Sequence, residues 1–558
     1  MISQILVPIA GTLLLYLLFP ILQVLYYNVT SPLRHVAGPR SPSLIFGNFK
    51  EMAGDPGLTA KWRKEFGPNI LFRGLFSIYE LHTSDLAAIN HIVTKPDIYQ
   101  KLPSNITSNE RLFGKGLVSV ELEEHRRQAS DPHINGWLHN PAFGIPQIRA
   151  VTEIFVEKAV ELRNIWASQV ADESDGGRIE ILSWLRRMTL DVIGQAGPPK
   201  VELLKSIGFN YQFDALQVDK KPNELNQVFA ELFHSPQSSR YATLRIQQAM
   251  VPILRLVPAS GSNFLREARN KMYAIGMQIV SKSKAEINAS KGEKNLGKSR
   301  DLLSTLLKAN LSTTIPETQR LNDAEVVGQI PTFFLAGHEQ PVKTTSLSTA
   351  WALYALSVNA AAQSKLREEL LTLSTDNPTL DELNSLPYLE YVVREVMRVH
   401  APVVFTQRMA MEDDVLPLSK PYIDKRGRSH DSLKIPKGQR IHIPILAINT
   451  DKAIWGEDAS EFKPERWDKI PESVSAIPGV WANLFTFFAG PHNCIGFRFA
   501  LAEMKSLLFT LVRAFEFELA VTGGIGPVTT GLLQRPTVLA DGPSAGLPLI
   551  VKPYNTQC

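Results

Sequence analysis

The chain opens with a long, uncharged and mostly apolar stretch. No Asp, Glu, Lys or Arg occurs from Met1 to Leu33, and the residues from Ile2 to Tyr27 are mostly Leu, Ile, Val and aromatic. About 20 such residues span a bilayer core as a helix, whereas the apolar part of a cleaved signal peptide is about 7 to 15 residues long and follows a charged start. The pattern therefore predicts a membrane anchor over residues 1–30, with a cleaved signal peptide as the competing interpretation.

Basic residues follow this stretch directly, at Arg34 and Arg40, with His35 between them. Lys and Arg gather on the cytoplasmic side of membrane spans. We therefore expect a single-pass protein that contacts membrane lipid and whose remaining residues face the cytosol.

Beyond the anchor, apolar positions follow helical and extended patterns in turn. The apolar run after residue 496 has a helical spacing, through Phe497, Ala500, Leu501 and Met504. The Pro- and Gly-punctuated, Ile- and Val-containing stretches from Leu433 to Ile448 predict short strands. No Gly/Ser-rich linker, internal repeat or block of like charge marks a seam, so residues 31–558 are predicted to form one large domain.

Composition excludes several classes of protein. Of the 558 residues, 44% are hydrophobic and 20% charged, so the chain can bury a large core. A formal net charge of +4 over this length gives no basic stripe, and nucleic acid is not an expected partner. The only cysteines are Cys494 and Cys558, fewer than a disulfide-stapled secreted fold uses, which indicates a reducing compartment.

Cys494 lies in a Gly-rich turn before a helical-looking run. The turn extends from Phe487 to Gly496, and its glycines, Gly490 and Gly496, can take backbone angles and close approaches that a side chain would forbid. A thiol at a helix start is favoured as the thiolate, because backbone N–H groups and the helix dipole stabilise negative charge there. Such a loop can lie flat against a large planar cofactor. An isolated cysteine would be better interpreted as buried and inert.

The spacing within this turn changes that interpretation. It resembles the haem-binding loop of the cytochrome P450 family: Phe, two residues, Gly, three residues, Cys, one residue, Gly. Phe487, Gly490, Cys494 and Gly496 meet every fixed position. The resemblance implies a mainly α fold with a small β region, and haem b (iron protoporphyrin IX) ligated by Cys494. His492 stands where the family usually has Arg, and would donate to a haem propionate more weakly and in a pH-dependent way.

Other family segments occur upstream in the expected order. Glu395 and Arg398 lie three apart on a helical stretch, which alone would indicate a surface ion pair. The segment from Phe462 to Trp467 resembles the one whose Arg, here Arg466, joins them in a buried structural triad. By the same resemblance, Arg408 and His125 are candidate contacts to the haem propionates.

The oxygen-activation segment departs from the family pattern. Residues Ile330 to Glu339 resemble the central helix that opens a groove for O₂, and Glu339 matches its acid. The next residue should be Thr but is Gln340, and Pro341 follows; Thr344 comes only after residues 340–343. Proline inside a helix costs about 3 kcal/mol or more, so this helix is expected to be distorted. Whether Thr344 takes the place of the usual threonine stays open.

Two further segments interrupt stretches of sequence that otherwise match the family pattern. Ala129 stands where an Arg is usual, and the continuation at residues 140–143 arrives late after the segment 129–139. Residues 198–208 interrupt a second run. Together with 340–343, these interruptions suggest imperfect intron boundaries in a gene model, which sequencing of the transcript would test.

The resemblance leaves two functions open. The first is a monooxygenase that uses O₂ and NADPH-derived electrons from a cytochrome P450 reductase, with cytochrome b5 as a further possible donor, on an apolar small molecule. The family's fungal, microsomal members imply an endoplasmic-reticulum location and a role in specialised (secondary) metabolism, such as terpenoid biosynthesis. The second is a P450-fold haem protein without monooxygenase activity, either an isomerase or dehydratase or inactive through its insertions. Glu339 and Thr344 favour the first; Pro341 and Ala129 favour the second.

Overall fold

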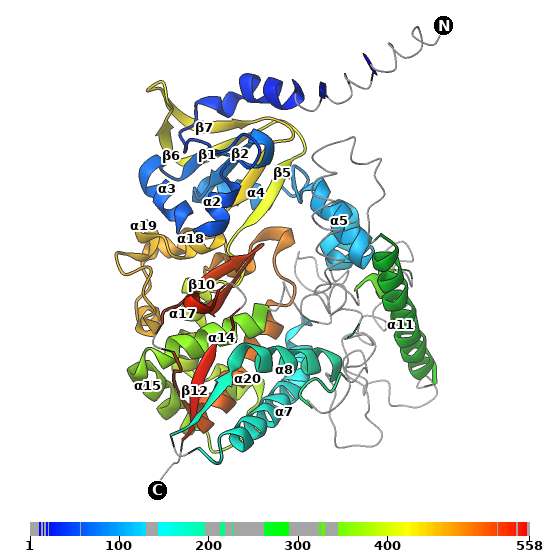
Figure 1. Ribbon diagram of the computed structural model, residues 1–558, viewed down its shortest axis with the longest axis vertical. Helices are drawn as coiled ribbons and strands as arrows, with labels where there is room; N and C mark the ends of the chain where they lie inside the picture. The colour runs from blue at the N-terminus through cyan, green and yellow to red at the C-terminus, as the bar shows by residue number, and fades with distance from the viewer. Residues whose placement is uncertain are drawn as a thin grey trace. The chain divides into compact units, whose positions relative to one another are not determined.

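The computed structural model describes most of the chain (Figure 1). The described residues are 11–12, 15, 18–19, 22–55, 57–129, 143–173, 175–195, 213–217, 227, 262–289, 322, 325–329, 344–521, 523–542 and 545–554. The chain divides into two compact units: unit 1 is Met1–Ser108, Glu231–Ala268 and Phe405–Ala447, and unit 2 is Asn109–Ala230, Arg269–Val404 and Ile448–Cys558. Among the described residues, three helices cross the division, namely α5 (Pro103–Phe113), α11 (Ser262–Ala289) and α18 (Ile445–Asn449).

Unit 1 is built around a sheet with the strand order β1-β2-β8-β5-β3. Apolar Trp62 of α3 packs on Ile70 and Phe72 of β1, so α3 covers one face of this sheet. A separate hairpin, β6 with β7, packs beside α4, whose N-cap Asp85 also accepts hydrogen bonds from Ser419 of β6. Besides a helix at residues 22–30, the elements are η1 (Pro32–His35), α2 (Phe49–Gly54), α3 (Leu58–Phe66), β1 (Asn69–Arg73), η2 (Leu75–Ser77), β2 (Tyr79–Thr83), α4 (Leu86–Thr94), β3 (Tyr99–Gln100), β5 (Thr406–Ala410), β6 (Asp414–Ile423), β7 (Ser429–Ile435) and β8 (Arg440–Ile443).

Unit 2 is mainly helical. Its central helix α14 is buried on every side from Ser346 to Leu353, as expected of a helix that is apolar all round. The helix α20 packs along α7, where the rings of Phe155 and Phe499 meet edge to face with centroids 4.7 Å apart. The described helices are α6 (Leu122–Ala129), α7 (Ile145–Gln169), α8 (Ile181–Gln195), α14 (Thr344–Ser357), α15 (Ala360–Leu371), α16 (Leu380–Asn384), α17 (Pro387–Val399), α19 (Lys452–Trp455) and α20 (Phe497–Ala514).

Short strands and turns complete unit 2. One antiparallel sheet has the order β4-β12-β9, from β4 (Gly177–Glu180), β12 (Pro548–Pro553) and β9 (Phe515–Leu519). A hairpin joins β10 (Ile525–Thr530) to β11 (Leu533–Val538). The short 3₁₀ turns are η3 (Leu117–Ser119), η8 (Pro464–Asp468), η9 (Glu472–Ala476), η10 (Phe485–Phe487), η11 (Gly490–His492) and η12 (Leu539–Asp541). The predicted mainly helical fold with some sheet is confirmed.

Two sequence expectations on this fold need comment. Strands were expected as far as Ile448, but β8 ends at Ile443 and Ile445–Asn449 is a helix. This part of the expectation is wrong, because Ile445, Ile448 and Asn449 are buried at a helical spacing. Among the described residues, no helix is both long and apolar enough to cross a bilayer; most of the predicted span, including residues 1–10, lies outside them.

Buried histidines are an unusual part of both cores. In unit 1, His82 of β2 and His442 of β8 face each other in the sheet register, with their Nδ1 atoms 3.1 Å apart and their rings stacked. In unit 2, His400 stacks on Trp351 with ring centroids 4.1 Å apart. Burial lowers the pKa of His442 and of His400 from 6.5 to about 3, and that of His82 well below 6.5. All three imidazoles are therefore neutral at pH 7.

We expect these histidines to make folding stability depend on pH. The unfolded chain binds more protons than the folded chain between about pH 3 and 6.5, so stability is fully present above that window and falls as the pH drops through it. The slope is about 1.4 kcal/mol per pH unit for each histidine. Denaturant midpoints measured from pH 7.5 to 5 check this: His442→Phe should flatten the slope, whereas Lys469→Ala, which replaces an exposed side chain that keeps its charge across this range, should leave it unchanged. An equal slope in His442→Phe and the unmodified chain would contradict the assignment.

Candidate functional site

The loop before α20 is a tight backbone turn. Phe488 and Gly490 have positive φ values of 60° and 65°, and the Gly is the residue that tolerates such angles without cost. The Cys494 N–H donates to the Phe487 carbonyl at 2.9 Å, and the Asn493 N–H donates to the Gly490 carbonyl at 3.1 Å. These bonds fix Cys494 just before Gly496, the N-cap of α20. The residues of the sequence motif therefore adopt one defined loop conformation.

Cys494 presents a free thiol at this loop. Its side chain is exposed, yet the surrounding protein raises the pKa of the thiol by desolvation, which a backbone hydrogen bond at Gly496 only partly offsets. The expectation that the helix start favours a thiolate stays a prediction. A bound metal ion has the opposite effect on the pKa of the thiol, since a thiol that coordinates a metal is deprotonated outright.

Aromatic rings support the loop from within. Phe487 packs against Trp481 and Phe497, with ring centroids 5.8 and 5.9 Å apart. Phe485 and Phe488 meet edge to face at 5.0 Å. Phe487, a predicted cofactor contact, is 8% exposed. The rings make the loop a stiff and mainly apolar support for the thiol.

Two of the predicted propionate contacts lie together beside this loop. The rings of His125, on α6, and His492 have centroids 4.4 Å apart. His492 Nε2 lies 2.7 Å from Glu121 Oε2, and both side chains are nearly buried. Sequence reasoning missed Glu121, although it stands one helical turn before His125. The carboxylate orients the imidazole that replaces the family's Arg.

A polar clamp ties α6 to residues 325–329. Arg127 forms an ion pair with Glu325, and the Gln329 amide donates to Gln128 Oε1 at 2.9 Å. Ala129, the departure from the usual Arg, ends α6. Residues 130–142 and 198–208, which hold the other interruptions, lie outside the described residues.

Arg408 belongs to β5 of unit 1. Its guanidinium is mostly buried, and Nη1 donates to the Thr406 hydroxyl at 3.1 Å and the Gln407 carbonyl at 2.8 Å. These bonds stiffen the side chain against the strand. The proposed role toward a propionate stays a prediction.

The structure brings the three residues of the predicted triad together inside unit 2. Arg398 donates to both carboxylate oxygens of Glu395, at 2.8 and 2.9 Å, and Arg466 Nε donates at 3.2 Å. Sequence reasoning missed two further donors, the Trp467 indole at 3.1 Å and the Lys463 backbone N–H at 3.0 Å. Glu395 and Arg398 are fully buried. The buried carboxylate thus has every partner that a fixed network requires.

Thr344 is the first residue of α14, and its carbonyl accepts a hydrogen bond from the Ser348 hydroxyl at 2.9 Å. Glu339, Gln340 and Pro341 lie outside the described residues. The neighbouring Thr345 donates to Glu503 of α20, a carboxyl that the sequence did not single out. Burial raises the pKa of Glu503 to about 8. This carboxyl is therefore mostly protonated at pH 7.

Comparison with known proteins shows the family of the chain. Residues 37–538 match the family model for Cytochrome P450. The chain belongs to the cytochrome P450 family. Cytochrome P450 monooxygenase 205 of Postia placenta is 47% identical over 534 residues, which cover 94% of each chain. Cytochrome P450 monooxygenase 128 of the same organism is 46% identical over 98% of this chain and 97% of its own.

A relative from a second organism supports the same family. Cytochrome P450 monooxygenase claO of Ampulloclitocybe clavipes is 33% identical and matches 94% of this chain and 93% of its own. The predicted family and enzyme class, a cytochrome P450 monooxygenase, are confirmed. The residues present fit the haem of this family, because an open thiol on a rigid aromatic loop stands beside imidazole donors.

Proposed function

We propose that this chain holds haem b through Cys494 and, with O₂ and reductase-supplied electrons, inserts one oxygen atom into an apolar small molecule. The observation that carries the proposal is the open Cys494 thiol in a loop that meets every fixed position of the family pattern. Bound haem would supply O₂ binding and O–O cleavage, favoured by electron density from the thiolate.

The chain's own residues would hold and orient this group. Phe487 and Gly490 shape the loop that would present the Cys494 thiol to the haem iron. His125, His492 and Arg408 would donate to the haem carboxylates, with Glu121 fixing the His492 ring. Glu339 and Thr344 would form the acid and alcohol that pass protons to the oxygen site.

Replacing His492 tests the carboxylate contacts. Removing one hydrogen bond to a charged group costs about 1.5–3 kcal/mol, so His492→Ala should lose haem about tenfold faster or more. His492→Arg should lose haem more slowly, because a guanidinium can pair with Glu121 and still offer further donors. Haem transfer to apomyoglobin measures both rates, with His430→Ala as the control. Equal rates in all variants would remove His492 from the site.

The substrate, partners and location extend the same proposal. Support comes from the names of the relatives, which are monooxygenases of Postia placenta and Ampulloclitocybe clavipes. We propose an apolar substrate of fungal specialised metabolism, such as a terpenoid, and a membrane-bound NADPH–cytochrome P450 reductase, with cytochrome b5 as an accessory donor. The apolar residues 2–27 support a membrane location at the endoplasmic reticulum, with the remaining chain in the cytosol.

The deciding experiment combines a spectrum with turnover. The expressed chain should give the reduced, CO-bound difference spectrum of a haem-thiolate protein, and should consume NADPH and O₂ with reductase while an oxygenated product forms. A correct spectrum with substrate conversion that needs no O₂ would instead support an isomerase or dehydratase. A correct spectrum with no turnover of any substrate would point to the interruption at residues 340–343.

A further inference from the structure

One face of α6 carries the two buried side chains of this helix. His125 and Gln128 lie three positions apart, so they share a face. The His125 ring meets the ring of His492, two residues before Cys494. Gln128 contacts Gln329, the residue immediately before the segment that resembles the oxygen-activation helix. One short helix therefore contacts both the cysteine loop and the start of that segment.

The side-chain amides of Gln128 and Gln329 form a closed hydrogen-bonded junction. Gln329 Nε2 donates to Gln128 Oε1 at 2.9 Å and to the Glu325 carbonyl at 3.2 Å. Gln128 Nε2 donates to the Lys115 carbonyl at 3.4 Å. Gln329 Oε1 accepts from the Leu117 N–H, also at 3.4 Å. Each polar atom of the two buried amides thus has a partner, and a fully paired buried network is rigid and fixes one arrangement.

Backbone packing at Gly328 supports the same junction. A Cβ on Gly328 would lie 2.9 Å from the carbonyl oxygen of Lys115 and 3.1 Å from its carbonyl carbon. The backbone at residues 115–116 therefore passes directly against the helical residues 325–329, where only a glycine leaves enough room. Close backbone contact holds the junction together with the amide pair.

The start of this helical segment is fixed as well. The Glu325 N–H donates to Asn322 Oδ1 at 2.9 Å, and the Asn322 N–H donates to Glu325 Oε2 at 2.8 Å, the reciprocal bonds of a capping box. The other carboxylate oxygen of Glu325 pairs with Arg127 of α6. Because Arg127 directly precedes Gln128, α6 holds the segment through an ion pair at its start and an amide pair at its end.

We propose that Gln128 and Gln329 are positioning residues for the monooxygenase reaction. Together they fix the point from which the oxygen-activation segment begins, relative to the helix that holds His125 against the cysteine loop. Both residues act through the segment that follows Gln329. The inference rests on the proposed function and deepens it, because it assigns the placement of that segment to a contact that no short motif encodes.

Gln128→Met and Gln329→Met test the proposal, because methionine keeps a similar length and shape without the amide. Each variant is studied as the full, haem-loaded chain, which is reduced and then mixed with air-saturated buffer. The rate at which O₂ oxidises the haem should rise about fivefold in either variant, a factor typical of one buried hydrogen bond. The infrared band of bound CO, which senses polar groups beside the gas, should shift or broaden in the same variants.

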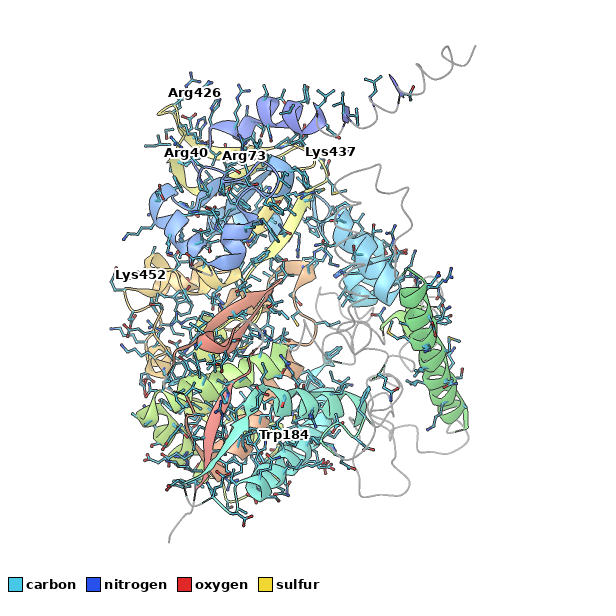
Figure 2. The ribbon with its side chains drawn as sticks, in the orientation of Figure 1. Arg40, Arg73, Trp184, Arg426, Lys437 and Lys452 are labelled. Atoms are coloured by element: carbon cyan, nitrogen blue, oxygen red, sulfur yellow. The ribbon has the colours of Figure 1, made fainter. Side chains whose placement is uncertain are left out.

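Two exposed residues of unit 2 give the controls. Gln169→Met makes the same chemical change at the end of α7. Lys452→Met alters an exposed side chain of α19, which Figure 2 labels. Both controls should keep the oxidation rate and the CO band of the unmodified chain.

The double variant Gln128→Met/Gln329→Met separates positioning from stability. Replacing both partners of a buried hydrogen bond by apolar groups of the same shape can leave stability nearly unchanged. Its denaturant midpoint should therefore exceed those of the single variants, while its oxidation rate and CO band stay altered. Recovery of the normal rate and band together with the midpoint would show that the pair only stabilises the fold, and would overturn the proposal.

Unaltered rates and bands in both single variants would also overturn it. If the methionine variants hold no haem, Gln128→Asn replaces them, because its shorter side chain keeps an amide that does not reach Gln329; the same two readings then decide. A failure of the proposed function is distinct, since it shows in the unmodified chain as a missing thiolate-type CO spectrum or a missing product. The comparison among variants needs no substrate.

Discussion

Cys494→Ala should abolish both the thiolate-type CO difference spectrum and all oxygenated product. Cys494 is the one free cysteine within the described part of the chain, and a thiolate is the electron-rich ligand that favours O–O cleavage. Cys494→Ser should behave in the same way, because a hydroxyl is a much poorer ligand. The measurement is the reduced CO spectrum together with product formation under NADPH, reductase and O₂.

The control for this prediction is Cys558→Ser, which should keep the spectrum and the turnover. Thermal unfolding of the apo form separates ligation from folding, because the exposed Cys494 side chain contributes little to the core. If Cys494→Ala retained the thiolate spectrum, Cys494 would not be the ligand. If Cys558→Ser lost it, the ligand assignment would move to the second cysteine.

Glu395→Ala should leave little haem-loaded, folded protein. Among the described residues, the substitution removes the only carboxylate partner of the buried Arg398 guanidinium, and it leaves Arg466 with Asp458 alone. Breaking a buried pair from one side costs about 3–5 kcal/mol, a large fraction of the stability of most proteins. Glu395→Gln should be intermediate, because the amide keeps one acceptor oxygen. The measurement is the denaturant midpoint and the yield of haem protein.

A surface pair gives the comparison. Asp381 and Arg149 meet at 3.0 Å with side chains more than half exposed, and exposed pairs contribute about 0–1 kcal/mol. Asp381→Ala should therefore unfold within about 1 kcal/mol of the unmodified chain. An equal loss of stability in Glu395→Ala and Asp381→Ala would show that the buried Glu395 network stabilises the fold no more than an exposed ion pair does.

Sequence alone reached those parts of the site that short motifs encode. The loop from Phe487 to Gly496 and the helix with Glu395 and Arg398 are local patterns, so their shape follows from nearby residues. Arg466 was found only through family resemblance, since no local rule pairs it with a carboxylate 71 positions away. Glu121, Trp467 and Glu503 were missed because their significance depends on which distant segment folds against them.

The pKa of Cys494 shows a different limit. A helix start and nearby N–H groups favour a thiolate, and both can be read from the sequence. The desolvation that raises the pKa of the thiol depends on how the folded chain surrounds the loop, which the sequence does not show. The stacked pair of His82 and His442 has the same origin, because a parallel register between β2 and β8 joins residues 360 positions apart. Such effects require the fold.

The hydrogen bonds of Arg398 also have a topological meaning. After Val404 the chain leaves unit 2, builds β5 to β8 of unit 1, and returns at Ile448. Arg398 precedes this excursion, and its Nη1 donates to the carbonyl of Asn449, just after the return, at 3.1 Å. The guanidinium therefore holds the two ends of this excursion together inside unit 2, so β5 to β8 form on a closed loop of the chain. Loss of the hydrogen bond between Arg398 and Asn449 would leave this loop open, so β5 to β8 would have more ways to pair incorrectly during folding.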